Sequence, residues 1–239
     1  MEKLKSMGPV KYKIIGIEQI THDTKSFKFG LPDDTALDFL PGDHMMMHAE
    51  IHDQVHKRPY TPASTPDDVG FFELVIKVYP NGLLSNYMFD KYVGEEVFLE
   101  GPTVGGHFQQ GMADKIAMVA GGAGITPMIA IIRTAIRRKW AVDMTLLYAN
   151  KTVNDIILRD EFENYAAAHD NFHLTLAVDE PAAGFAGHVG FIDDDLLKKS
   201  LPPVEDDPLI FLCGPPMMEY KLREKILALG YPKKRLVIP

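Results

Sequence analysis

The feature that most constrains the fold is a change of pattern near Met112. Before this point, short β-rich runs alternate with turn residues, and after it, apolar runs alternate with helical patterns. Turn-bounded β runs are typical of antiparallel sheets, whereas strand–helix alternation builds a parallel sheet with helices on both faces. The sequence therefore predicts two domains, residues 1–108 and 112–239, joined by the glycine-rich connector 101–111.

The first half predicts a six-stranded antiparallel β-barrel. About six short strands with almost no helix favour a closed barrel, because closure removes exposed sheet edges. One short helix is expected over 83–89, after Asn81-Gly82. The segment around Arg58 and Tyr60 is expected to be extended. The other expected strands are 11–17, 26–29, 44–51, 71–79 and 96–99.

The second half predicts an α/β domain with a parallel sheet. Its apolar runs fit strands that are buried on both faces, and the segments between them have helical periodicity. The expected strands are 116–120, 144–148, 172–178 and 209–212, and the expected helices are 127–139, 156–168, 194–200 and 217–229.

Composition excludes several classes of function. The net charge of -8 argues against nucleic acid as a partner, since phosphate backbones select basic surfaces. A single cysteine excludes an internal disulfide and a four-thiolate iron–sulfur cluster. No apolar run approaches the ~20 residues of a spanning helix, and the N-terminus lacks an apolar stretch, so we expect a cytoplasmic protein without a membrane span.

Four histidines, His44, His48, His52 and His56, are spaced by four residues. On a helix this spacing would form a metal-binding stripe. The surrounding sequence predicts extended chain, in which residues four apart are separated by about 13 Å. We therefore expect no metal site here.

Arg58 and Tyr60 are separated by one residue, so on a strand they share a face. A guanidinium matches a diphosphate in geometry and charge, and an aromatic ring can cover a flat heterocycle. Thr61 adds a hydroxyl and an amide that could bond a flavin ring nitrogen. A short helix after Gly82 would direct backbone amides at the same phosphates, with Ser85 as an added donor.

The glycine-rich segment Gly121–Pro127 follows an apolar strand and is expected to open a helix at Pro127, a favoured first helical residue. Residues without side chains permit close approach of the backbone to a diphosphate, and a helix N-terminus supplies positive potential. The segment therefore predicts a dinucleotide site in the second half. The lone Cys213 closes a further apolar strand before Gly214 and Pro215.

Several segments, in a fixed order along nearly the whole chain, resemble the ferredoxin–NADP reductase superfamily and most closely its NADH–cytochrome b5 reductase branch. In that family a flavin-binding barrel precedes a nicotinamide-nucleotide domain. The matching segments are Arg58-Pro59-Tyr60-Thr61-Pro62, 74–79, Gly82 with 85–87, Gly101-Pro102, 121–128 and 213–217.

The resemblance implies site residues in both halves. Arg58 and Ser85 would hold the flavin diphosphate, Tyr60 would lie along the ring and Thr61 would bond near its reactive nitrogen. Cys213 would lie beside the nicotinamide without acting as a nucleophile. Thr61 and Cys213 are thus the expected catalytic positions. The remaining expected cofactor-binding residues are Pro59, Val75, Lys77, Leu83, Leu84, Gly121, Gly122, Gly124, Thr126, Asp155, Gly214 and Pro215.

The implied function is that of a flavin-dependent NADH reductase, which passes a hydride from NADH to FAD and then electrons to a separate acceptor. The acceptor could be a cytochrome, a ferredoxin, a flavodoxin or a small molecule. FMN stays open as the flavin because the stretch after Tyr79, which helps hold the adenosine of FAD in the family, is short here. The alternative is a redox sensor, or a reductase subunit of a multi-component oxygenase without independent turnover.

Two further expectations concern charge. NADPH users of the superfamily usually place serine and arginine after the second parallel strand, but 149–155 contains no arginine, and Asp155 would repel the extra phosphate. We therefore expect NADH to be preferred over NADPH. Arg133 and the basic run 137–139 are expected to form a solvated helix face on which an electron-transfer partner could dock.

Overall fold

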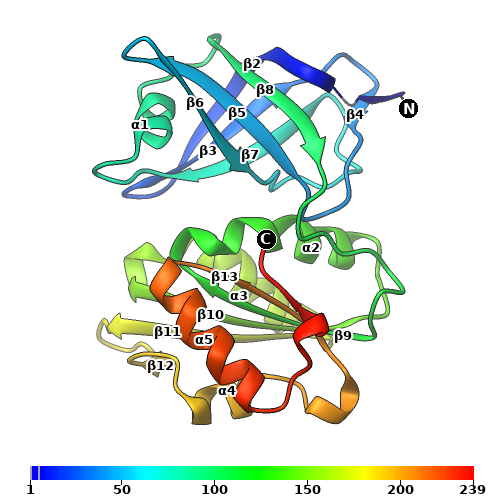
Figure 1. The fold of residues 1–239 in the computed structure, drawn as a ribbon, viewed down its shortest axis with the longest axis vertical. Coiled ribbons are helices and arrows are strands. Elements are labelled where there is room, and N and C mark those ends of the chain that lie inside the picture. The colour runs from blue at the N-terminus through cyan, green and yellow to red at the C-terminus, as the bar shows by residue number, and fades with distance from the viewer. Residues whose placement is uncertain (1, 5) are drawn as a thin grey trace. The chain divides into compact units, whose positions relative to one another are not determined.

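The computed structural model describes residues 2–4 and 6–239, which form two compact units (Figure 1). The first unit runs to Phe108 and also includes Ile129–Thr134, while the second comprises Gln109–Met128 and Ala135–Pro239. The predicted fold class, an antiparallel β domain followed by a parallel α/β domain, is confirmed.

The first unit contains a six-stranded antiparallel sheet in the order β6-β5-β8-β2-β3-β7. An isolated antiparallel bridge between Pro62 and Leu74 joins the segment after β6 to β7, at the opposite end of this order. Helix α1 spans Leu83–Phe89, as predicted. The strands are β2 (Ser6–Thr21), β3 (Thr24–Gly30), β5 (His44–Ile51), β6 (Gln54–Tyr60), β7 (Phe71–Lys77) and β8 (Glu96–Thr103). Two short strands, β1 (Glu2–Leu4) and β4 (Thr35–Leu37), pair in parallel.

Alternation along β7 separates the core of the first unit from a polar face. Phe72, Leu74 and Ile76 are buried in the core, where the rings of Phe72 and Phe29 stack with centroids 5.1 Å apart. Since successive residues of a strand point to opposite sides, Glu73, Val75 and Lys77 share the other face. This face carries residues that the sequence predicts to line a cofactor.

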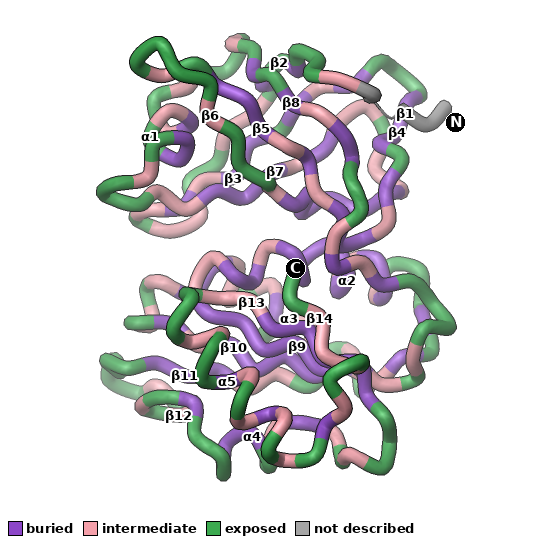
Figure 2. The backbone as a smooth tube through the Cα atoms, viewed as in Figure 1, coloured by how far each residue is buried: buried purple, intermediate pink, exposed green. Residues whose placement is uncertain are grey.

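The second unit contains a parallel six-stranded sheet in the order β12-β11-β10-β9-β13-β14. The central strands are buried along most of their length (Figure 2), which explains why they read as continuous apolar runs. The strands are β9 (Lys115–Gly121), β10 (Asp143–Thr152), β11 (Phe172–Glu180), β12 (His188–Val189), β13 (Leu209–Cys213) and β14 (Leu236–Val237). The helices after the connector are α2 (Thr126–Arg137), whose residues Ile129–Thr134 belong to the first unit, α3 (Arg159–Ala168), α4 (Asp194–Ser200) and α5 (Pro216–Ala228). Short 3-10 turns are η1 (Gly122–Ile125), η2 (Val153–Asp155), η3 (Val204–Asp206) and η4 (Lys233–Arg235).

Three predicted helix starts differ from the structure, and the smallest difference is at α5, which begins at Pro216, one residue earlier than predicted. The glycine-rich segment forms the 3-10 turn η1 before α2 begins at Thr126, one residue earlier than predicted. Helix α3 begins at Arg159 rather than at 156, because η2 and the left-handed Leu158 (φ 57°) intervene after β10. Strand β8 also extends to Thr103, so the connector is shorter than predicted.

The prediction that Arg133 is solvated was wrong. Its guanidinium Nη1 donates to the Ala63 carbonyl (2.9 Å) and lies 2.6 Å from Glu73 Oε2, within the first unit. The side chains of Arg133 and Glu73 are only 19% and 13% exposed. Arg137, one turn later on the helix, is exposed as predicted.

Trp140, the chain's single tryptophan, is buried in the second unit directly after the basic run. The Arg138 guanidinium lies 6.0 Å from the centroid of its ring. The indole is therefore part of the packing of the second unit.

The structure contains no helix, over the residues that it describes, with the length and apolar character needed to cross a membrane.

Candidate functional site

Strand β6 places the predicted Arg58 and Tyr60 on one sheet face, opposite Met47 and Met45 of β5. The Arg58 side chain is exposed, and its Nη1 donates to the Lys57 carbonyl (2.8 Å). Tyr60 is half-buried, and burial raises the pKa of its phenol to about 12, against the opposing effect of the Arg58 charge. The phenol is therefore neutral at physiological pH and can act as a hydrogen-bond donor with a flat apolar ring.

The predicted residues of β6 and β7 belong to neighbouring segments. The bridge from Pro62 to Leu74 brings the chain after Tyr60 alongside β7. Thr61, which precedes this bridge, and Val75 of β7 are both buried. The first unit thus places Thr61 beside β7, directly after the aromatic ring of Tyr60 and three residues after the Arg58 cation.

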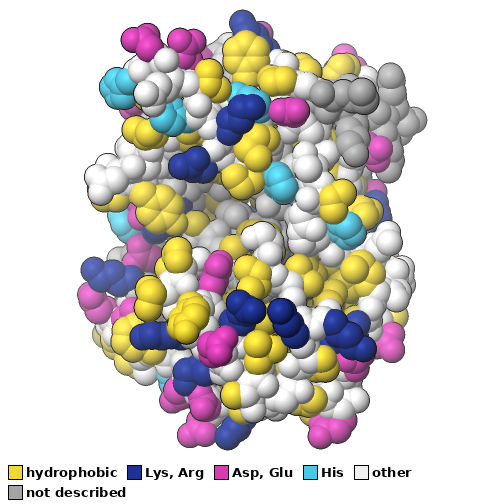
Figure 3. All heavy atoms as spheres, in the orientation of Figure 1, with side chains coloured by type: hydrophobic (Ala, Val, Ile, Leu, Met, Phe, Trp, Pro, Cys, Tyr) yellow, Lys and Arg dark blue, Asp and Glu magenta, His cyan; other side chains and the backbone are white. Residues whose placement is uncertain are grey.

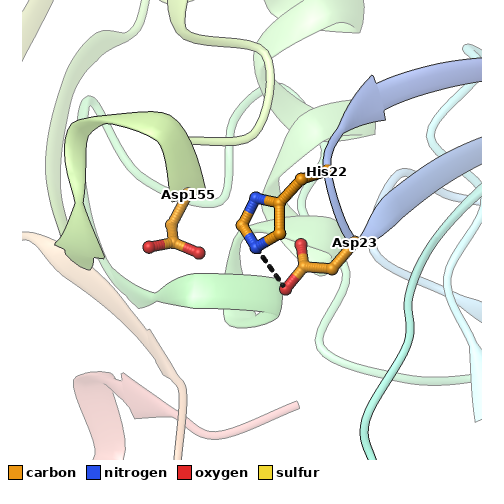
Figure 4. Close-up of side chains that lie close together, drawn as sticks. All are labelled: His22, Asp23 and Asp155. Atoms are coloured by element: carbon orange, nitrogen blue, oxygen red, sulfur yellow. Dashed lines mark ion pairs between the residues drawn. The ribbon is translucent and has the colours of Figure 1, made fainter.

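Lys77 is fixed by a carboxylate that the sequence analysis missed. Its Nζ lies 2.6 Å from Asp23 Oδ2, which belongs to the turn between β2 and β3. Asp23 Oδ1 accepts hydrogen bonds from the Thr21 hydroxyl (2.9 Å) and the Thr24 hydroxyl (3.2 Å). His22 Nε2 is 3.5 Å from Asp23 Oδ2 (Figure 4). Sequence alone gave only a weak signal, a Thr-His-Asp-Thr turn between two strands.

The pKa of Asp23 is lowered by these partners. Burial by itself would raise the pKa of this carboxyl, but the hydrogen bonds from Lys77 and Thr21, together with the positive charge of Lys77, more than offset burial. The carboxylate is therefore ionised at neutral pH and holds the Lys77 ammonium in one place.

At α1, the structure places Leu83 in solvent and buries Leu84 and Ser85. The Ser85 hydroxyl donates to the Gly82 carbonyl (3.1 Å) and accepts from the Tyr79 amide (3.3 Å). A Cβ at Gly82 would collide with this hydroxyl, so a larger residue there would displace the Ser85 side chain. The hydroxyl predicted to hold a phosphate therefore closes the turn before α1, and the first amides of the helix remain as candidate anion donors.

In the second unit, the glycine-rich turn packs directly against the segment that follows β13. A Cβ at Gly124 would collide with the Cys213 carbonyl, and a Cβ at Gly121 would collide with the Met218 sulfur. Gly122 differs, because it has a φ of 52° and open space where a Cβ would project. Two motifs that are about 90 residues apart in the sequence thus lie in contact at the carboxyl ends of β9 and β13, the edge at which parallel sheets commonly bind ligands.

Thr126, the first residue of α2, donates from its hydroxyl to the Ala123 carbonyl (3.0 Å). This bond closes the glycine-rich turn on itself. Gly214 donates its amide to Glu219 Oε1 of α5 (2.9 Å), which fixes the chain between β13 and that helix. Pro215, the N-cap residue of α5, is exposed.

Cys213 carries a neutral thiol. Burial raises the pKa of this thiol to about 12, and the charge and hydrogen bonding of Glu219 act in the same direction. The thiolate, rather than the thiol, is the nucleophilic form of cysteine. The side chain is therefore suited to shape a pocket wall and is unsuited to covalent chemistry.

Two polar residues lie near the carboxyl end of β10. Asp155 closes the turn η2, since its Oδ2 accepts from the Thr152 amide (3.0 Å) and the Thr152 hydroxyl (2.7 Å); its carboxylate is drawn in Figure 4. Asn150 is buried, and neither atom of its carboxamide has a hydrogen-bond partner in the part of the chain that the structure describes. Its neighbour Ala149 pairs with Gly121, so Asn150 adjoins the glycine-rich turn. Nothing in the local sequence distinguished Asn150.

Comparison with protein families gives two matches, one in each unit. Residues 11–109 match an oxidoreductase FAD-binding domain, and residues 118–224 match an oxidoreductase NAD-binding domain. The first match contains the Arg58 segment and the start of α1. The second contains the glycine-rich turn and Cys213.

Two relatives are similar over nearly the full chain. NADH-cytochrome b5 reductase 1 of Debaryomyces hansenii is 36% identical over 230 residues, and that of Scheffersomyces stipitis is 37% identical over 231 residues. Each comparison covers 95% of this chain and 81% of the relative. Among solved structures, the cytochrome b5 reductase domain of Ulva prolifera nitrate reductase is similar with a TM-score of 0.90 and 29% identity, covering 100% of both chains.

Proposed function

This chain belongs to the family of NADH-cytochrome b5 reductases, and we propose that the acceptor of its electrons is a cytochrome of the b5 type. It is an FAD-dependent oxidoreductase that transfers electrons from NADH to an acceptor. The proposed acceptor is supported by the similarity to NADH-cytochrome b5 reductases. The binding of two cofactors is supported by the contact of the glycine-rich turn with the Cys213 segment, in a chain whose other unit carries Arg58, Tyr60 and Thr61.

The donor set of the first unit fits FAD. The exposed Arg58 guanidinium supplies a fixed cation for the diphosphate, and the first amides of α1 supply backbone donors. Tyr60 offers a half-buried neutral ring. Thr61 and Val75 are buried and would contact the flavin in a region that excludes most water. We assign FAD binding to residues 1–108.

The second unit fits the diphosphate of a nicotinamide dinucleotide. Gly122 leaves open space beside a turn whose other glycines are in close contact with neighbouring atoms, so the backbone can approach a ligand there. Thr126 stabilises the turn through its bond to Ala123. We assign nucleotide binding to residues 112–239, with Gly121, Gly122 and Gly124 at the diphosphate and Cys213 to Pro215 at the nicotinamide.

When bound, FAD supplies the two-electron acceptance from NADH and the stepwise release of electrons to the acceptor. The protein's own contribution is orientation and exclusion of water. Thr61 presents a hydroxyl and a backbone amide, Lys77 presents an ammonium fixed by Asp23, and Cys213 presents a neutral thiol. No ionised nucleophile is needed in this scheme.

Preference for NADH is supported by the charges at the carboxyl end of β10 and in η2. The segment from Lys151 to Asp155 contains no arginine, and the Asp155 carboxylate would repel the extra phosphate of NADPH. We expect kcat/KM for NADH to exceed that for NADPH by at least about tenfold, which corresponds to about 1.4 kcal/mol. Comparable values for the two nucleotides would contradict this assignment.

The overall charge of the chain does not decide between acceptors. The net charge is -8, yet acidic and basic side chains are intermixed over the visible face of the second unit (Figure 3). Total charge therefore does not select a partner, because local patches govern docking.

The decisive experiment mixes FAD-loaded protein with NADH without oxygen and follows the yellow flavin absorbance. Rapid bleaching, followed by faster turnover with a b5-type cytochrome than with a ferredoxin or a flavodoxin, is the expected result. Bleaching without faster turnover of the cytochrome would refute the proposal that the acceptor is a b5-type cytochrome. An unbleached spectrum would indicate a sensor or a dependent subunit instead.

A matched pair of variants tests the flavin site. Arg58→Ala should lose FAD, since it removes the cation assigned to the diphosphate. Lys57→Ala serves as the control, because Lys57 is the adjacent exposed cation and points to the opposite face of β6. Equal flavin content in the two variants would show that Arg58 does not hold the FAD diphosphate.

A further inference from the structure

We propose that the buried Tyr148 hydroxyl positions the glycine-rich turn and thereby sets the affinity for the dinucleotide. The inference rests on the proposed function, in which η1 binds the diphosphate. It adds a positioning residue that lies outside every segment to which the sequence analysis assigned a cofactor-binding role.

Tyr148 joins two turns at the carboxyl edge of the parallel sheet. It lies on β10 and is fully buried, with its ring edge-on to that of Phe162 at a centroid distance of 6.3 Å. Its hydroxyl donates to the Gly122 carbonyl (3.0 Å) and accepts from the Ile157 amide (3.3 Å). One oxygen atom therefore connects η1 to the chain between η2 and α3.

Gly122 is the member of the turn that most needs such a restraint. Gly121 and Gly124 are confined by close contacts with Met218 and Cys213, whereas a Cβ at Gly122 would meet nothing within 4 Å. Glycine has the largest backbone freedom of any residue, and short 3-10 turns have poor hydrogen-bond geometry. The bond from Tyr148 fixes the orientation of the peptide that follows Gly122.

Orientation of this peptide affects nucleotide binding. The N–H of Ala123 belongs to the same peptide plane as the Gly122 carbonyl, so holding the carbonyl inward directs the N–H the opposite way. A turn that is already ordered loses less conformational entropy when it binds a ligand. Removing the hydroxyl should therefore weaken binding of the diphosphate without changing groups that touch the reacting atoms.

The test compares Tyr148→Phe with Tyr231→Phe in the FAD-loaded protein. Tyr231 is also buried in the second unit, and its hydroxyl donates to the Pro202 carbonyl (2.7 Å), so both variants lose one partly buried tyrosine–carbonyl bond. Calorimetric titration with ADP-ribose and with NAD⁺ measures binding directly. We expect Kd to rise about threefold to tenfold for Tyr148→Phe and to stay within about 1.5-fold of wild type for Tyr231→Phe.

Two additional readouts separate positioning from general damage. KM for NADH should rise in Tyr148→Phe while kcat at saturating NADH stays unchanged. Amide hydrogen exchange should accelerate at Ile157, which loses its acceptor, and in Gly122–Ile125. Unchanged Kd in Tyr148→Phe, or an equal rise in both variants, would overturn the inference.

Failure of the proposed function gives a different pattern. If the wild-type protein binds neither ADP-ribose nor NAD⁺ and NADH does not bleach its flavin, the assignment of the second unit is wrong. If the wild-type protein binds these ligands and Tyr148→Phe binds them equally well, only the role of Tyr148 is wrong.

Discussion

Lys77 shows how one residue acquires a fixed position from a distant turn. Replacing Asp23 by Asn removes the charge that faces Lys77 but keeps an oxygen for the Thr21 and Thr24 hydroxyls. We expect a loss of about 1–3 kcal/mol in the free energy of unfolding at neutral pH, measured by urea denaturation. Asp33→Asn, at an exposed position of the same unit, should change it by less than about 0.5 kcal/mol.

The effect of Asp23→Asn should depend on pH in one direction. The pKa of Asp23 is lowered in the folded protein, so its contribution to the free energy of unfolding is complete above the pKa of the unfolded chain, about 4. This contribution is lost as the pH falls through the lower pKa of the folded protein. The difference between wild type and variant should therefore shrink in acid, and a difference that grew there would contradict the ion pair.

Cys213 gives a prediction on reactivity. With a pKa of about 12, the thiol at pH 8 has on the order of a thousandfold less thiolate than a cysteine with the ordinary pKa of about 8.5. Iodoacetamide should therefore label the native protein far more slowly than the urea-unfolded protein, as followed by mass spectrometry. Glu219→Gln, which removes the nearby charge, should accelerate native labelling. Fast labelling of the native wild type would show that the thiol is activated.

The residues that sequence could predict are those whose role depends on local spacing. The Arg58 segment and the glycine-rich turn lie at the ends of strands, and the residues next to them in the sequence are enough to predict those strands. Asp23, Tyr148 and Asn150 could not be found in this way, because their surroundings are created by sheet register and by packing between distant segments. The prediction that Arg133 is solvated was wrong for the same reason, since a helical pattern does not reveal the Glu73 carboxylate on β7.

At the scale of elements, long apolar runs predicted β9, β10, β11 and β13, and turn-bounded runs predicted most of the antiparallel sheet. The strands that were missed are short: β1, β4, β12 and β14 have two or three residues each, too few for a period to show. Helix starts shifted where 3-10 turns intervened at Gly122 and Val153. Such turns depend on hydrogen bonds made by the folded chain, including the capping box of Thr152 with Asp155.

Arg133 of helix α2 forms a largely buried ion pair with Glu73 of β7. Removing one partner of a largely buried pair leaves the other charge without compensation. Arg133→Ala should lower the free energy of unfolding by about 3 kcal/mol, measured by urea denaturation. Arg137→Ala, at an exposed position one turn along the helix, is the control and should cost less than about 0.5 kcal/mol. Equal effects would mean that the pair contributes nothing specific.

At the scale of the whole molecule, FAD should stabilise the fold through mass action. A ligand at a concentration one hundred times its Kd adds about 2.7 kcal/mol to the unfolding free energy. We expect the unfolding temperature of the FAD-depleted protein to rise by about 5–10 °C with excess FAD in scanning calorimetry. The same excess should leave Arg58→Ala unchanged, and an equal rise in that variant would place the cofactor elsewhere.

Trp140, the chain's single tryptophan, is buried in the second unit and is therefore an intrinsic fluorescent probe of that unit. Its fluorescence emission reports unfolding of the nucleotide-binding unit alone, while the change in flavin absorbance on release of FAD reports unfolding of the flavin-binding unit. A denaturation experiment without any added dye can therefore tell whether the two units come apart together or one after the other.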